Sequence, residues 1–166
     1  MASKLPRLVR ELAMWLLIGV AVSLAVDYFR QPELPQNFAS AALQTLDGKP
    51  VDLIAMSEER PLLVYVWATW CGVCRYTTPS VSALAAEGGN VMSVALRSGD
   101  NATLERWLAK KKMTLPTVND ASGSLSRQWD VQVTPTLVVI SHGEVKSITT
   151  GWTSSWGMRL RLWLAS

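Results

Sequence analysis

The chain has 166 residues, of which 49% are hydrophobic and only 17% are charged, and its net charge is +3. This length suits one ordinary domain with an additional segment, and the low charged fraction points to a membrane segment. The balance of charge argues against a nucleic-acid partner. Two cysteines and one histidine are too few for a disulfide-stapled scaffold or a four-ligand zinc site.

The N-terminal segment combines a basic stretch with an uncharged apolar run. Residues 1–11 carry three basic residues against one acid, and residues 12–26 are uncharged. As a helix this run spans roughly 22 Å, and aromatic flanks extend it toward the roughly 30 Å of a bilayer core. We predict a cytoplasmic segment at 1–11 and a single transmembrane signal-anchor at 12–29, with the remainder exported. A cleaved signal peptide is the alternative, because Ser23 and Ala25 have suitable spacing.

A short tether separates this segment from the predicted domain. Residues 30–40 contain two prolines among mostly polar neighbours, which is typical of an extended linker. The domain is therefore expected at 41–166. It begins with two short alternating runs on either side of Asp47-Gly48, which predict a hairpin. A polar turn or short helix is expected at 57–60.

The next elements surround the two cysteines. The apolar run 62–66 predicts a buried strand, because Val and Tyr favour the extended form. A helix is expected from Cys74 to residue 87, with a kink at Pro79. A second buried strand is predicted at 91–96, followed by a helix from 100 or 101 to 112.

The last third of the chain predicts an extended piece at 115–118 and a helical turn at 125–129. Strands at 133–140 and 144–150 are expected to form an antiparallel hairpin. A final helix should run to residue 164, and four of its apolar residues recur near helical spacing. The predicted order after the first hairpin is β-α-β-α-β-β-α.

This order and several motifs together resemble the thioredoxin superfamily. More narrowly the chain resembles the membrane-anchored TlpA-like proteins, nearest the suppressor-of-copper-sensitivity D (ScsD) type of Gram-negative bacteria. The residues that carry the resemblance are Trp67, Trp70, Cys71, Cys74, Pro79, Thr134 and Pro135. The resemblance covers 41–166 and implies a thioredoxin-like three-layer α/β fold with a mixed central sheet. It also implies a cis Pro135 opposite the cysteines, with Thr134 beside them.

The position of the cysteines predicts thiol–disulfide exchange. A thiol at a helix N-terminus faces unpaired N–H groups and the positive end of the dipole, which stabilise the thiolate. Cys71, before the first turn, is the expected nucleophile, and Cys74, one turn in, is the expected resolving thiol. An inert structural disulfide is the alternative, but so short a loop stabilises little. The Cys71–Cys74 pair is the only redox group predicted, with no separate cofactor and no metal.

Five further residues are expected to support the cysteines or to contact clients: Trp70, Gly72, Val73, Thr134 and Pro135.

The chain also departs from the family pattern. Tyr65 lies where thioredoxins usually have a buried acid, six residues before the first cysteine. Thr77 lies where many TlpA-like reductants have Glu. The resemblance implies that those acids move the proton of the resolving thiol.

We therefore predict a periplasmic disulfide oxidoreductase that is tethered to the bacterial inner membrane, exchanges disulfides with protein clients and acts in copper-stress tolerance. The resemblance implies a membrane redox partner of the DsbD or ScsB kind. The alternative is a copper-handling module with the two thiolates as Cu(I) ligands. Two polar features, Lys110–Lys112 and His142, are expected to be solvated surface groups. The direction of electron transfer is left open.

Overall fold

A computed structural model describes residues 5–30, 34–35 and 38–166, and it divides into two compact units, Met1–Gln31 and Pro32–Ser166. The first unit contains one helix, α1 (Leu5–Arg30). The predicted transmembrane segment 12–29 falls within α1. Across the described parts of the chain, however, no helix is found to combine the length and apolar character needed to cross a membrane. The predicted span is therefore not confirmed.

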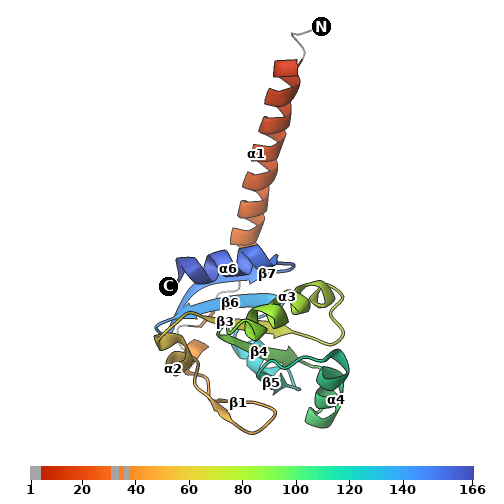
Figure 1. The fold of residues 1–166 in the computed structure, drawn as a ribbon, viewed down its shortest axis with the longest axis vertical. Helices are drawn as coiled ribbons and strands as arrows, with labels where there is room; N and C mark the ends of the chain where they lie inside the picture. Colours follow the sequence, from red (N-terminus) through yellow and green to blue (C-terminus); the bar gives the residue numbers. More distant parts are fainter. Residues whose placement is uncertain (1–4, 31–33, 36–37) are drawn as a thin grey trace. The chain divides into compact units, whose positions relative to one another are not determined.

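The second unit is organised around a five-stranded mixed sheet with strand order β5-β4-β3-β6-β7 (Figure 1). The central strand β3 is parallel to β4, which is parallel to β5, whereas β6 is antiparallel to both β3 and β7. The strands are β3 (Leu62–Trp67), β4 (Val91–Leu96), β5 (Thr117–Asp120), β6 (Thr136–Ser141) and β7 (Glu144–Thr150). The predicted mixed central sheet is confirmed.

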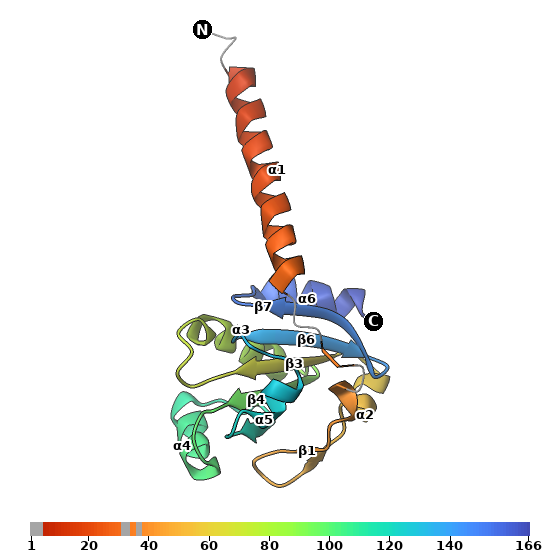
Figure 2. The same cartoon turned by 180° about the vertical axis from the view of Figure 1, so that it is seen from behind.

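Helices cover both faces of this sheet (Figures 1 and 2). They are η1 (Phe38–Ser40), α2 (Leu53–Glu58), α3 (Cys74–Ala86), α4 (Asn101–Lys111), α5 (Ser124–Gln128) and α6 (Ser155–Leu164). The side chains of β3 alternate between two buried clusters. Val64 and Val66 belong to the cluster with η1, α2 and α5, and Tyr65 and Trp67 belong to the cluster with α3, α4 and α6. Because both faces are covered, all six residues of β3 are buried.

Local sequence signals explain most element boundaries. The predicted hairpin forms from β1 (Leu43–Gln44) and β2 (Pro50–Val51). Side-chain oxygens cap three helices at their N-termini, and they come from Asp52, Asp100 and Ser154. The strand predicted at 115–118 forms two residues later, because Pro116 has no N–H for the ladder. The strand predicted from 133 begins at Thr136, after a cis Thr134–Pro135 peptide bond.

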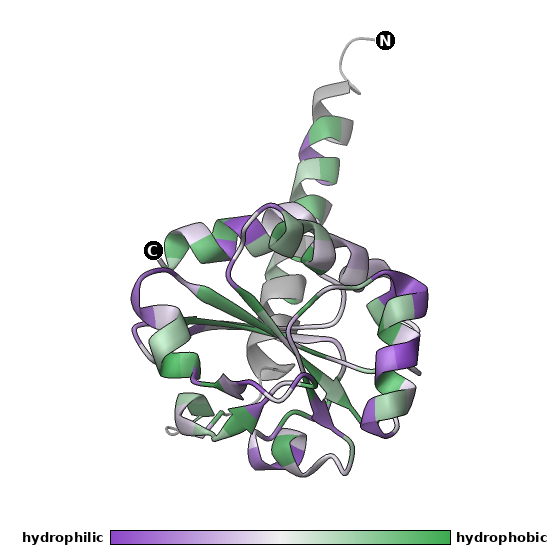
Figure 3. Cartoon of the chain, turned by 60° about the horizontal axis from the view of Figure 1, so that its bottom comes forward, coloured by the Kyte–Doolittle hydropathy of each residue, from purple (hydrophilic) through white to green (hydrophobic). Residues whose placement is uncertain are grey.

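Two segments pack differently from what their sequence suggests. Phe38 lies in the predicted tether, yet it is buried, and the centre of its ring lies 4.2 Å from the ring centre of Trp129. In α6 the apolar residues at helical spacing face outward, with Trp156 83% and Trp163 71% exposed, while Met158 enters the core. Figure 3 shows the contrast between the largely hydrophobic strands and the mixed helices. Spacing identifies a common helix face but does not reveal which face meets the sheet.

Candidate active site

The site is built where β3 passes into α3. The first residue of α3 is Cys74, and the residue before it, Val73, provides no side-chain cap. The backbone N–H of Cys74 instead donates to Cys71 Sγ at 3.1 Å. This sulfur therefore lies at the positive end of the helix dipole, and a thiolate there would be stabilised.

The two cysteines differ in their access to solvent. They are joined as a disulfide, with their Cα atoms 5.3 Å apart. Cys74 is 2% exposed, whereas Cys71 is only partly buried. A reacting sulfur from outside the protein can therefore reach Cys71 but not Cys74.

The cis Thr134–Pro135 peptide lies opposite the disulfide, as expected. Cys71 Sγ is 3.5 Å from the carbonyl oxygen of Thr134. The carbonyl of Pro135 accepts the N–H of Gly151 at 2.8 Å, so the residue after β7 is bonded to the end of this loop. Thr134 is half-buried, and its neighbour Val133 is 50% exposed. Backbone of the loop is thus presented beside the more accessible sulfur.

Trp70 lies on the surface next to Cys71 and is 62% exposed. Its indole N–H donates to the carbonyl oxygen of Arg97 at 3.1 Å. One residue earlier, the backbone N–H of Thr69 donates to Ser98 Oγ at 3.0 Å. These two bonds fix the cysteine loop to the segment after β4, while Gly72 and Val73 are exposed.

Neither of the two positions where the resemblance implied acids, Tyr65 and Thr77, carries a charge. The Tyr65 hydroxyl forms a buried hydrogen bond of 2.8 Å with Thr78 Oγ1. Burial raises the pKa of Tyr65 to about 12, although the bond to Thr78 opposes part of the rise. Tyr65 is therefore neutral at physiological pH. Thr77 is fully buried, and its hydroxyl has no hydrogen-bond partner within the described chain.

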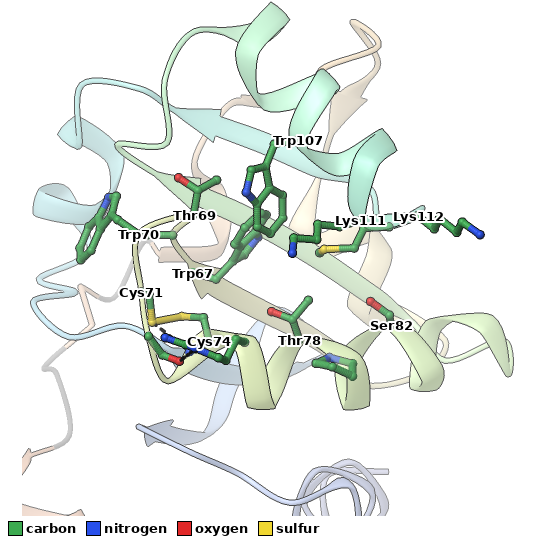
Figure 4. A pocket seen from close by; sticks show the side chains of 15 residues that line it. Trp67, Thr69, Trp70, Cys71, Cys74, Thr78, Ser82, Trp107, Lys111 and Lys112 are labelled. Carbon is green, nitrogen blue, oxygen red and sulfur yellow. Dashed lines mark hydrogen bonds between the residues drawn. A yellow bond between two sulfur atoms is a disulfide. The ribbon is translucent and has the colours of Figure 1, made fainter.

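A pocket of about 560 Å³ opens beside the disulfide, between α3 and α4. Figure 4 shows Thr78 and Ser82 on one wall and Trp107 and Lys111 on the other. The sequence predicted Lys110–Lys112 as solvated surface groups, so this pocket was missed. No periodicity or motif in the sequence indicates that α4 lies across a pocket from the cysteine helix.

The described part of the chain contains no cluster of metal-binding side chains. Within the described residues, no group of three or more His, Cys, Asp or Glu side chains comes together. His142 lies in the turn between β6 and β7, with its Nδ1 3.6 Å from an oxygen of Glu58 on the surface.

Comparison with known proteins gives consistent matches. The family model described as Redoxin matches residues 32–154. A "Thioredoxin-like protein" of Haemophilus influenzae is 39% identical over 162 residues, which cover 98% of this chain and 97% of the relative. The "Thiol:disulfide interchange protein DsbE" of Pseudomonas fluorescens is 29% identical over 151 residues, which cover 87% of this chain and 84% of the relative. In fold, the chain is similar to a secreted disulfide oxidoreductase of Mycobacterium tuberculosis, with a TM-score of 0.63 and 22% identity over 78% of this chain and 99% of that one.

Proposed function

The chain belongs to the Redoxin family and is a thioredoxin-like disulfide oxidoreductase, and on that premise we propose that Cys71 is its nucleophile and Cys74 its resolving thiol toward protein clients. One observation carries the assignment. Cys71 Sγ accepts the first N–H of α3 at 3.1 Å and is partly accessible, whereas Cys74 is 2% exposed. Thiolate stabilisation and access therefore coincide at Cys71.

In the proposed reduction, the Cys71 thiolate attacks a client disulfide. A mixed disulfide forms between Cys71 and the client, and the other client sulfur leaves as a thiolate. Cys74 then loses its proton and attacks Cys71 Sγ, so that the second client thiolate leaves. The client gains two electrons, and the protein ends with the Cys71–Cys74 disulfide. Oxidation of a client follows the same steps in reverse.

The exposed surface around Cys71 is proposed to hold the client chain. Trp70 and Val73 are 62% and 43% exposed and lie on either side of the cysteine in sequence. The loop before cis Pro135 presents backbone next to the sulfur, with the Thr134 carbonyl oxygen 3.5 Å away. An extended client segment would pair with this backbone as an added strand does.

The proposed location is outside the cytoplasm, with the chain tethered at the membrane by residues 12–29. The support is sequence-based: a basic N-terminus followed by fifteen uncharged residues. Washing membranes from producing cells with alkaline carbonate tests the tether, since an anchored chain stays in the pellet. A protein recovered in the wash, or cleaved after residue 25, would contradict it.

A membrane redox partner of the DsbD kind and a role in copper tolerance extend this proposal. Both are supported only by the likeness to ScsD-type proteins. A copper-binding module remains the competing function, because two thiolates are soft ligands. Titrating the reduced protein with Cu(I) and equilibrating it with glutathione buffers separates the two. Tight stoichiometric Cu(I) binding without reversible dithiol–disulfide cycling would overturn the oxidoreductase proposal.

The cysteine roles are tested by trapping. In the Cys74→Ser variant the mixed disulfide cannot be resolved, so covalent complexes with clients should accumulate on non-reducing gels. Cys71→Ser is the matched control, because it removes one sulfur from the same loop but leaves only the buried thiol. If Cys71→Ser traps clients as well as Cys74→Ser does, the assignment of the two roles is wrong.

A further inference from the structure

The pocket between α3 and α4 is cationic and reaches the disulfide. Its lining includes both Cys71 and Cys74. The charged residues of its lining are Arg75, Lys111 and Lys112, and no Asp or Glu is among them. Its volume of about 560 Å³ lies in the range of small-ligand pockets.

Two of these cations come from different helices, α3 and α4. Arg75 lies beside the cysteines, where its Nε donates to the carbonyl oxygen of Gly72 at 3.0 Å. Lys111 comes from α4, and its Nζ lies 5.8 Å from the centre of the Trp107 ring. Figure 4 shows the Lys111 side chain directed into the pocket toward Trp67, whereas Lys112 extends away from it.

The wall of the pocket also contains polar groups that lack partners. Trp67 Nε1 and Ser82 Oγ are buried and form no hydrogen bond with any described residue. Because these two atoms have almost no accessible surface, they do not decide what binds, and the three cations of the lining favour an occupant that carries negative charge.

We propose that this pocket binds a carboxylate that the substrate carries close to its reacting sulfur, with Lys111 as the principal cation. The inference rests on the proposed function and adds a substrate class to it. When the substrate sulfur reacts at Cys71, a carboxylate close to that sulfur can enter the pocket, because Cys71 is itself part of the pocket lining. The carboxylate can come from an Asp or Glu beside the client cysteine, or from a small thiol that bears an acid.

The reaction that reports on binding is reduction of the Cys71–Cys74 disulfide by a substrate thiol. The substrate thiolate attacks Cys71 Sγ, the Cys71–Cys74 bond breaks, and Cys74 leaves as a thiolate that takes up a proton. A second substrate thiolate then attacks the mixed disulfide and releases Cys71. Two substrate thiols become one disulfide, and the protein gains the two electrons.

The test uses the oxidised full chain and two pairs of thiols. One pair is a short peptide with Glu or Gln two residues after its cysteine, and the other is 3-mercaptopropionate or its amide. Rates of disulfide reduction are divided by the thiolate fraction of each thiol, because a nearby carboxylate changes the thiol pKa. The charged-to-neutral rate ratio is then compared between the unmodified chain, Lys111→Gln and Lys110→Gln. Lys110 is the matched control, since it is exposed, belongs to the same lysine run and does not line the pocket.

We expect Lys111→Gln to lower the charged-to-neutral rate ratio about threefold, which is the effect of losing one exposed ion pair. Lys110→Gln should leave this ratio unchanged. A drop in the peptide pair alone assigns the carboxylate to protein clients, and a drop in the small-thiol pair alone assigns it to a small acid. An unchanged ratio in both pairs, or equal drops in both lysine variants, overturns the inference. Failure of every thiol to reduce the disulfide would instead overturn the proposed function.

Discussion

The buried hydrogen bond between Tyr65 and Thr78 should make their substitutions strongly non-additive. The two hydroxyl oxygens are 2.8 Å apart, and the residues are 0% and 8% exposed. Removing either hydroxyl leaves the other without a partner, at a cost of about 1–3 kcal/mol. Removing both leaves neither hydroxyl unpaired, so the second substitution adds little to the cost of the first.

The magnitude follows from this asymmetry. We expect Tyr65→Phe and Thr78→Val each to lower the free energy of unfolding by about 1–2 kcal/mol, since Thr78 lies at the pocket wall where water can partly replace its partner. The double variant should be destabilised by about the same amount as either single variant. The coupling energy is then about 1–2 kcal/mol, several-fold to more than tenfold in the folding equilibrium.

Urea unfolding of the oxidised protein, followed by tryptophan fluorescence, measures all four chains of the cycle. Tyr76→Phe is the control, because it removes the same hydroxyl from a side chain that is 66% exposed. It should change stability by less than about 0.5 kcal/mol. If the double variant is destabilised by the sum of the two single effects, the hydroxyls do not interact in the folded protein and the reasoning is refuted.

Two further predictions concern ionisation and capping. Tyr65 has a pKa of about 12 in the folded protein and of about 10 in the unfolded chain, so the unfolded chain loses this proton first as the pH rises. The contribution of Tyr65 to the free energy of unfolding is therefore complete below pH 10 and falls by about 1.4 kcal/mol per pH unit between pH 10 and 12. Urea unfolding should show a smaller alkaline loss for Tyr65→Phe, and an equal loss would contradict this. Asp120 is 4% exposed and accepts the N–H of Ser126 at 2.8 Å at the start of α5. Asp120→Asn should therefore lower the free energy of unfolding by about 1–2 kcal/mol in the same assay, whereas exposed Asp130→Asn should leave it nearly unchanged.

Much of the fold could be predicted because its signals are local. An apolar run without alternation marks a strand covered on both faces, as in β3. Asp100 marks the start of α4 because its side chain accepts the N–H of Thr103. The cysteine spacing and the Thr-Pro pair before an apolar run also lie within short stretches of sequence. The resemblance built on these motifs to the thioredoxin-like proteins is confirmed, whereas the narrower likeness to the ScsD type stays a prediction.

The features that were missed depend on contacts between distant segments. Phe38 enters the core because it meets Trp129, more than ninety residues away, and nothing near Phe38 indicates this. The apolar residues on the outward face of α6 recur with the same spacing as those of a helix that packs on a core. Which face of α6 contacts the sheet is therefore not visible in its sequence. Lys111 belongs to the active-site pocket only because α4 lies on the same face of the sheet as α3. Sequence patterns describe each helix separately, and these three properties belong to pairs of elements.

The first turn of α3 begins with a sulfur where most helices have an oxygen cap. Oxidation and reduction therefore change the charge at the cap of a helix that packs into the core, and each redox state should have its own free energy of unfolding. By a thermodynamic cycle, the difference between those two free energies equals the shift of the reduction potential between the folded and unfolded chain, about 30 mV for each 1.4 kcal/mol. The stability of the folded protein therefore depends on the redox state of the cysteine pair, and thiols that reduce this pair change the free energy of unfolding as well as the reactivity of Cys71.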